Sequence, residues 1–419
     1  MLTPPSLLPL IPQEHPLPNG NTLHLFRNDA VGILKLDFTL EAGSAYQSFK
    51  SQSHAANQLF AEATVDQSPE QVAEFLDFRG IVVERSADVC TGNVSFYFMR
   101  KFADELLPLI ARMFEAPSVT PQLFDAYISR RTAQLKTNFQ RTNYLARNRY
   151  YELLYGYDHP MGTYASPQDL QKLTLPAVTD FMRQHYSLAS AHIILSGPVD
   201  DDLIRLVECH LAPNSTTAAP ARVSLPVTPR PPAQPDHIIL PGTVQSTIRI
   251  GRILPFPWHS MDYTRFMVLN TVLGGYFGSR LMSNLREDKG YTYGIYSQTQ
   301  IFRDSIVLYI TADVAAPATH DAVNEILHEI EHLRKQPVPE EELERVRNYM
   351  MGDFIRSIDG IFEISERYRQ MVSTDVDERL SANLMETLAA VTPSQLLSLA
   401  QSTLTDLITV TSGPALDPQ

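Results

Sequence analysis

Two side chains that can donate hydrogen bonds to one oxygen atom lie seven positions apart in residues 273–295. Arg286 lies near the end of a segment with helical periodicity, and Tyr293 lies just inside the predicted strand that follows. With the turn at Gly290 holding them close, a guanidinium and a phenol can stabilise an oxygen that gains negative charge. The alternative interpretation is structural: the arginine compensates the helix C-terminus and the tyrosine packs.

The same stretch opens with three glycines: Gly274, Gly275 and Gly278. Glycines let another backbone approach closely, so they either admit a peptide substrate or let two helices pack. The sequence favours neither use. Phe277, Leu281 and Leu285 share one face of the helical periodicity and are expected to point the same way.

The order of these residues resembles the C-terminal signature of the pitrilysin/insulinase family of zinc peptidases. That family also contains the mitochondrial processing peptidase and the core proteins of the respiratory cytochrome bc complex. Its signature is a glycine-rich turn, a Ser-Arg-Leu helix and Leu-Arg-Glu-x-x-Gly-x-x-Tyr, and residues 279–293 contain the last two elements in order. The resemblance implies that Arg286 and Tyr293 reach an active site whose zinc is bound by a different half.

In catalytic members of that family, an N-terminal helix carries His-x-x-Glu-His, and a glutamate on a later helix completes the zinc site. The histidines share a helix face and the first glutamate is the general base. Here residues 54–58 read His-Ala-Ala-Asn-Gln, so Asn57 replaces the base and Gln58 replaces the second ligand. No glutamate occurs between residues 115 and 152. We expect no metal at His54, whereas Asn57 and Gln58 are candidates for binding a peptide.

A second metal motif occurs in residues 328–332, which read His-Glu-Ile-Glu-His. The helical periodicity places His328 and His332 toward solvent with Glu325. The opposite, buried stripe is expected to contain Val323, Ile326, Leu327, Ile330 and Leu333. An exposed helix face supplies neither an enclosed cavity nor a fixed third ligand. We therefore expect a solvated polar face, with adventitious surface metal or a true peptidase site as the alternatives.

The chain repeats one order of elements on both sides of a Pro-rich linker. Residues 1–210 form the N-terminal half with the degenerate zinc motif, residues 211–235 the linker, and residues 236–419 the C-terminal half with the Arg/Tyr motif. Ser-Gly-Pro at 196–198 recurs at 412–414. The pattern predicts an α+β fold of two homologous halves, each a mostly antiparallel sheet with helices on one face. The resemblance implies a clamshell arrangement.

Composition restricts the class of partner. Hydrophobic residues make up 44% and charged residues 19%, as in a globular protein, and the net charge of −13 argues against nucleic acid and anionic membranes. Cys90 and Cys209 are predicted to be inert core thiols. The N-terminus has neither a basic region nor an unbroken apolar stretch, so the expected location is the cytoplasm.

Together these features predict a non-catalytic subunit of a heteromeric zinc metallopeptidase, inactive alone. A homologous, zinc-bearing partner would complete the heterodimer, and this chain would close the peptide chamber and donate Arg286 and Tyr293 to the scissile carbonyl. One alternative is a peptide-binding or scaffold protein of the same fold without peptidase activity. The other is an independent metallopeptidase that uses His328 and His332.

Overall fold

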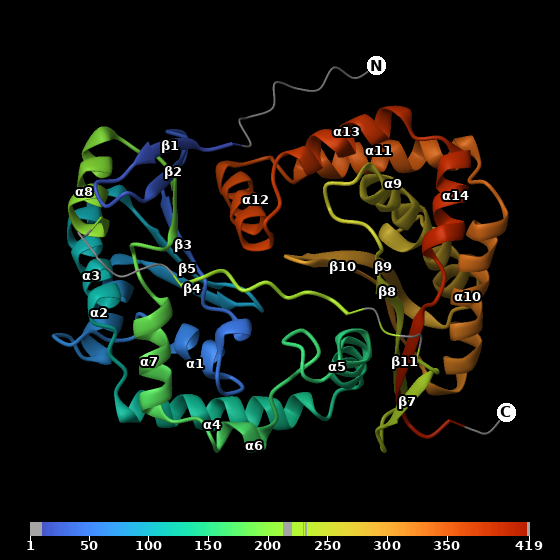
Figure 1. Ribbon diagram of the computed structural model, residues 1–419, viewed down its shortest axis with the longest axis horizontal. Coiled ribbons are helices and arrows are strands. Elements are labelled where there is room, and N and C mark those ends of the chain that lie inside the picture. The colour runs from blue at the N-terminus through green and yellow to red at the C-terminus, as the bar shows by residue number, and fades with distance from the viewer. Residues whose placement is uncertain (1–10, 213–219, 229, 231–232, 417–419) are drawn as a thin grey trace. The chain divides into compact units, whose positions relative to one another are not determined.

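The computed structural model describes residues 11–212, 220–228, 230 and 233–416, which form two compact units (Figure 1). Unit 1 comprises residues 1–135, 165–223 and 357–375, and unit 2 comprises residues 136–164, 224–356 and 376–419. Each unit therefore contains a segment from the other side of the predicted linker. Residues 213–219, 229 and 231–232 of that linker lie outside the described residues.

Unit 1 is built on a sheet with the strand order β1-β2-β6-β3-β5-β4. In chain order the strands are β1 (Gln13–Pro16), β2 (Thr22–Arg27), β3 (Leu34–Leu40), β4 (Val82–Ala87), β5 (Gly92–Phe98) and β6 (His192–Gly197). β2 and β6 are parallel, and the other neighbours are antiparallel. The Pro-rich N-terminal arm thus contributes β1 and β2 at one edge of the sheet.

The two faces of this sheet differ because successive residues of a strand point to opposite sides. Leu34, Leu36 and Phe38 of β3 point into the core of unit 1 with the apolar faces of its helices. These helices are α1 (Gln52–Leu59), α2 (Pro69–Arg79), α3 (Ala103–Glu115), α4 (Pro121–Asn138), α6 (Pro167–Leu170), α7 (Leu175–His185) and α8 (Asp201–Leu211), with the short η1 (Ser44–Tyr46) and η2 (Arg100–Phe102). Lys35 and Asp37 alternate with the core residues and point to the other face.

Unit 2 repeats this topology with the strand order β7-β11-β8-β10-β9. The strands are β7 (Asp236–Ile239), β8 (Gln245–Ile253), β9 (Thr292–Phe302), β10 (Ser305–Ala315) and β11 (Ile408–Gly413). β7 and β11 are parallel and the other neighbours antiparallel, as in β2-β6-β3-β5-β4 of unit 1. The predicted α+β class, with a mostly antiparallel sheet in each half, is confirmed.

The helices of unit 2 include two of the π type, which the sequence did not predict. They are α5 (Thr142–Tyr155), α9 (Met261–Asn270), the π-helices η3 (Thr271–Gly275) and η4 (Met282–Asp288), η5 (Ala316–Ala318), α10 (Thr319–Lys335), α11 (Glu340–Arg356), α13 (Arg379–Ala390) and α14 (Pro393–Thr403). Among the described residues, no helix combines the length and the apolar character that crossing a membrane requires.

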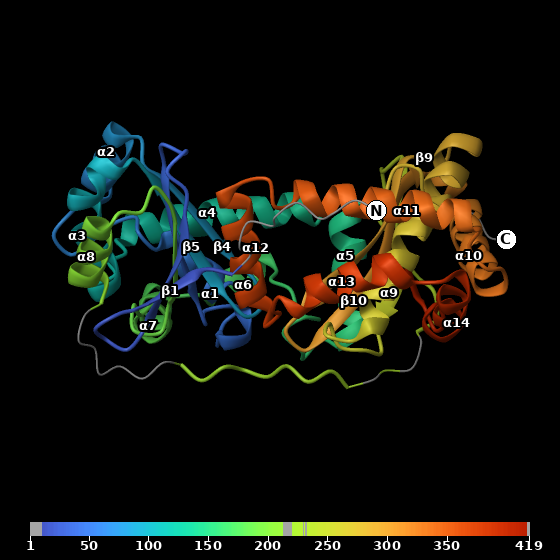
Figure 2. The ribbon, with the colours of Figure 1, turned by 90° about the horizontal axis from the view of Figure 1, so that it is seen from above.

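One helix in each unit covers the second face of the sheet, and each comes from the other side of the predicted linker. In unit 1, α12 (Ile361–Thr374) packs on β2, β3 and β6; in unit 2, α5 packs on β8 and β11. Figure 2 shows each of these two helices beside the sheet of its own unit. Tyr150 of α5 is fully buried, and its hydroxyl donates to the Leu308 carbonyl at 2.5 Å. The prediction of helices on one face omitted these two helices, because only tertiary packing places them.

The two cysteines differ in exposure. Cys90 is buried as predicted, but Cys209 is exposed, so the prediction of a core thiol there is wrong. α8 is amphipathic and buries Leu203, Val207 and Leu211, and Cys209 lies outside that stripe.

Candidate functional site

The segment that carries Arg286 is not a regular helix. After η3, residues 276–279 form a turn, and Arg286 lies in η4, whose hydrogen bonds span one residue more than those of an α-helix. The Tyr291 amide then donates to the Leu285 carbonyl at 2.9 Å, and Gly290, with φ of 67°, directs the chain into β9. Such π-helical turns are frequent at functional sites.

The prediction that Phe277, Leu281 and Leu285 share one face is wrong at Phe277. Leu281 and Leu285 are fully buried, but Phe277 is 59% exposed because it lies in the turn before the helix begins. The Arg286 guanidinium lies over the Phe277 ring, 4.6 Å from its centroid. Within the described residues no carboxylate forms an ion pair with Arg286, so its N–H donors are not neutralised by the protein's own acids.

Tyr293 lies on β9, at the edge of the sheet of unit 2. Its side chain is 92% exposed, whereas its neighbour Thr292 is buried. η4, which carries Arg286, packs against β9, the strand that carries Tyr293. The phenol hydroxyl is therefore open to a ligand or to another protein.

Among the glycines of this stretch, Gly274 has a clear packing role. A Cβ atom at Gly274 would lie 2.7 Å from the Ser297 Cβ, so a side chain there would separate η3 from β9. Asn270, the last residue of α9, is joined to Ser297 of β9 by hydrogen bonds of 2.9 and 2.5 Å. A Cβ atom at Gly275 would approach the Thr271 side chain and the Asn270 carbonyl, and one at Gly278 would approach the Tyr276 ring. Contact of these glycines with a substrate remains a prediction.

In unit 1, α1 positions the degenerate zinc motif. Asn57 is fully buried, and its amide donates to the Asn93 carbonyl at 3.1 Å, which joins α1 to β5. The side chain at the general-base position is thus used inside the fold. Gln58, in contrast, lines a cavity.

His54 is held as a neutral imidazole. Its Nδ1 forms a 2.9 Å hydrogen bond with the Tyr127 hydroxyl of α4. Burial, assisted by the charge of Arg131, lowers the pKa of His54 to about 4. At neutral pH the ring therefore carries no charge.

The cavity beside His54 has a volume of about 510 Å³ and contains three arginines. Its lining consists of His54, Gln58, Glu62, Arg85, Tyr127, Arg130, Arg131 and Gln134. Glu62 is paired with Arg85 at 3.0 Å. In the part of the chain that the structure describes, no group of three or more His, Cys, Asp and Glu side chains could hold a metal ion.

Only one of the two α10 histidines lies on a solvated face as predicted. His328 is exposed, but His332 is half-buried, with Nδ1 3.4 Å from a nitrogen of Arg280. Glu329 accepts a 2.7 Å hydrogen bond from Asn284. The predicted buried stripe is also wrong at Leu327, which is 40% exposed. The face with Glu329 and His332 packs toward η4, where Arg280, paired with Glu342 at 2.8 Å, occupies the Nδ1 side of His332.

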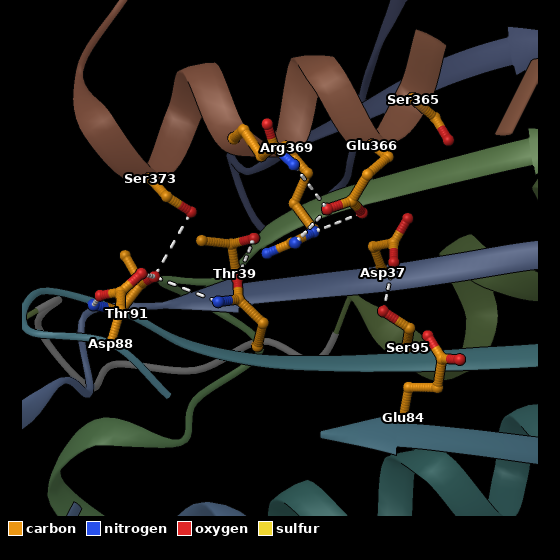
Figure 3. A network of polar contacts seen from close by, with 12 residues as sticks. Asp37, Thr39, Glu84, Asp88, Thr91, Ser95, Ser365, Glu366, Arg369 and Ser373 are labelled. Carbon is orange, nitrogen blue, oxygen red and sulfur yellow. Dashed lines mark hydrogen bonds and ion pairs between the residues drawn. The ribbon is translucent and has the colours of Figure 1, made fainter. Parts of the chain in front are cut away.

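The second face of the unit 1 sheet carries a buried ion network that the sequence did not predict (Figure 3). Lys35 Nζ lies 3.1 Å from Asp37 and 3.2 Å from Glu366 of α12, and Ser95 donates to Asp37 at 2.5 Å. Arg369 binds both carboxylate oxygens of Glu366. This network joins α12 to β3.

Burial and charge affect the two carboxyl groups of the network differently. Burial raises the pKa of Asp37, although Lys35 and Ser95 act in the other direction. Burial also opposes ionisation of Glu366, but its hydrogen bonds and ion pairs with Arg369 and Lys35 outweigh that effect and lower its pKa to about 2. Glu366 is therefore the ionised acid that attaches α12 to the sheet.

Residues 172–350 match the family model described as the peptidase M16 inactive domain. This part of the chain is similar to the M16 peptidase family. The match includes the stretch with Arg286 and Tyr293, and it confirms the resemblance to zinc peptidases that the order of those residues indicated.

Several known proteins and a solved structure are also similar to this chain. An uncharacterized zinc protease of Streptomyces coelicolor is 25% identical over 55% of this chain and 51% of its own length, so the chain spans about half of that relative. The zinc protease YmxG of Bacillus subtilis is 22% identical over 82% of this chain and 83% of its own. A non-peptidase homolog of the same name from Helicobacter pylori is 21% identical over 57% and 55%.

The solved structure is a peptidase M16 inactive domain from Pseudomonas fluorescens, with a TM-score of 0.86 and 19% identity over 97% of this chain and 99% of that chain. At this identity the likeness concerns the fold alone. The M16 relatives thus include proteins named as zinc proteases and one named as a non-peptidase.

Proposed function

We propose that this M16 relative is the non-catalytic subunit of a heteromeric zinc metallopeptidase. It would donate Arg286 and Tyr293 to the zinc site of a homologous partner and would be inactive alone. One observation carries the proposal: both donors are present and unpaired with any carboxylate of the described residues, whereas Asn57 and Gln58 occupy the positions of the base and the second zinc ligand.

The proposed chemistry follows from the two donor groups. When a peptide bond is attacked, its carbonyl oxygen gains negative charge, and a phenol O–H and guanidinium N–H groups can donate to that oxygen. The partner's zinc would supply an activated water molecule. Phe277, stacked under Arg286, limits the orientations of the guanidinium and so prepares it for one direction of donation.

The remaining parts of the proposal concern the peptide and the assembly. This chain would close the peptide chamber, with Gln58 and the exposed Gly278 as candidate contacts to substrate. We place the heterodimer in the cytoplasm, because both cysteines are free thiols, as is usual in a reducing compartment.

Co-purification from the native cell tests the proposal. We expect a second chain with His-x-x-Glu-His to accompany this one, stoichiometric zinc in the complex, and hydrolysis of a peptide mixture by the complex but not by this chain alone. A complex without zinc or hydrolysis would contradict the proposal and favour a scaffold protein. Zinc bound by the isolated chain and lost on His328→Ala would favour an independent peptidase.

A further inference from the structure

The cavity of unit 1 beside His54 carries an excess of positive charge in a chain whose net charge is −13. Arg85 of β4 and Arg130 and Arg131 of α4 contribute guanidinium groups to it, and Glu62 is its only acidic lining residue. Across the described residues neither Arg130 nor Arg131 is paired with a carboxylate. The cavity is therefore electropositive without an internal counter-ion for two of its three arginines.

The three arginines differ in how many hydrogen bonds the fold gives them. Arg85 donates to the Phe60 carbonyl at 2.7 Å and is paired with Glu62, so its position is fixed by the protein. Arg131 donates only to Gln134, at 2.8 Å, and its Nε is buried without a hydrogen-bond partner. Within the described residues the other Nη group of Arg131 has no acceptor, so it is available to an anion in the cavity.

The shape and charge of these groups indicate the class of ligand. The planar fork of a guanidinium matches the two oxygens of a carboxylate, and a carboxylate carries a single negative charge. A phosphate can bind the same fork, so the choice of a carboxylate rests on the neutral amides beside the arginines. Gln58 and Gln134 add neutral amides that can pair with a peptide group next to the carboxylate.

We propose that this cavity binds a carboxylate, such as the C-terminus of a peptide, with Arg131 and Arg130 as its principal donors. The positions of the degenerate zinc motif would then form part of an anion site. This site belongs to unit 1 alone, and it does not depend on Arg286, Tyr293 or a partner subunit.

Saturation-transfer NMR with the isolated full chain tests the proposal. The probe is N-acetylglycine, which mimics a peptide C-terminus, and the matched uncharged probe is N-acetylglycinamide. We expect N-acetylglycine to bind at least about tenfold more tightly than the amide, because a hydrogen bond between two charged groups is stronger than one to a neutral amide. Arg131→Gln should remove this preference, and Arg130→Gln, at an exposed position that leaves the fold intact, should reduce it.

Arg205→Gln is the matched control, since Arg205 is an exposed arginine of α8 outside the cavity. Equal binding of acid and amide, an unchanged preference in both Arg130→Gln and Arg131→Gln, or an equal loss in Arg205→Gln would overturn the proposal. Inorganic phosphate serves as competitor. If phosphate displaces N-acetylglycine at a lower concentration than acetate does, the site belongs to phosphate. That result would also overturn the proposal of a carboxylate ligand.

Discussion

The two units share one strand order but use their polar side chains in opposite ways. Unit 1 buries polar side chains: Lys35 and Asp37 lie under α12, and Asn57 lies against β5. Unit 2 covers the equivalent face of its sheet with tyrosines of α5 and leaves Tyr293 exposed. The difference indicates that these polar residues of unit 1 stabilise its fold, whereas the Tyr293 side chain of unit 2 takes little part in the packing of its own unit.

This comparison predicts a large loss of stability from Lys35→Met. Removing Lys35 leaves the buried Asp37 without its cation, and breaking a buried ion pair in this way costs about 3–5 kcal/mol. Chemical denaturation measures the free energy of unfolding, with Lys172→Met, an exposed lysine of unit 1, as the control. The double variant Lys35→Met/Asp37→Leu should recover most of the loss. Equal losses of unfolding free energy in Lys35→Met and Lys172→Met would contradict the stabilising role of the buried polar residues of unit 1.

A smaller loss is expected for Asn57→Ala. The variant removes the hydrogen bond to the buried Asn93 carbonyl, which costs about 1–3 kcal/mol of unfolding free energy. Asn57 faces the interior. The folded fraction of Asn57→Ala should therefore show unchanged peptide turnover in the proposed heterodimer. Loss of turnover with normal stability would instead give Asn57 a direct role with substrate.

Tyr150→Phe tests the cover helix of unit 2. The variant keeps the aromatic ring and removes only the hydroxyl that donates to the Leu308 carbonyl, so we expect a loss of about 1 kcal/mol. The matched control is Tyr144→Phe on the same helix, where the hydroxyl has no such acceptor among the described residues. A loss as large as that of Lys35→Met would show that both sheets depend equally on polar contacts to their cover helices.

Acid pH should weaken the ion network that attaches α12 to the sheet of unit 1. The pKa of Glu366 is lowered from 4.5 to about 2, so its stabilising effect is fully present above about pH 4.5 and is lost as pH falls through about 2. The difference in unfolding free energy between wild type and Glu366→Gln should therefore shrink as pH decreases over this window. A difference that stays constant from pH 6 to pH 2.5 would contradict the ionised state of Glu366.

Local signals were sufficient for most elements. α2 begins at Pro69 after Ser68, which forms a capping box with Gln71, and it ends at Gly80 in the left-handed conformation. Caps of this kind and hydrophobic periodicity indicate where a helix begins and ends. These features depend only on neighbouring residues.

Features that depend on distant contacts were not predictable in the same way. The cover helices α5 and α12 are exchanged across the linker, and no local pattern specifies which sheet a helix will cover. Phe277 does not share the predicted face because residues 276–279 form a turn before the helix begins. The arginines of the anion cavity left one signal: Arg130 and Arg131 have no acidic residue three or four positions away.

Peptide turnover by the co-purified heterodimer carrying Tyr293→Phe tests the central claim most directly. Removing one donor to a developing oxyanion lowers turnover by about a hundred- to a thousand-fold in other proteases. We predict a loss of that size, with assembly and unfolding free energy unchanged because Tyr293 is 92% exposed, and no loss in the control Tyr296→Phe on the same strand. Wild-type turnover in Tyr293→Phe would contradict the account.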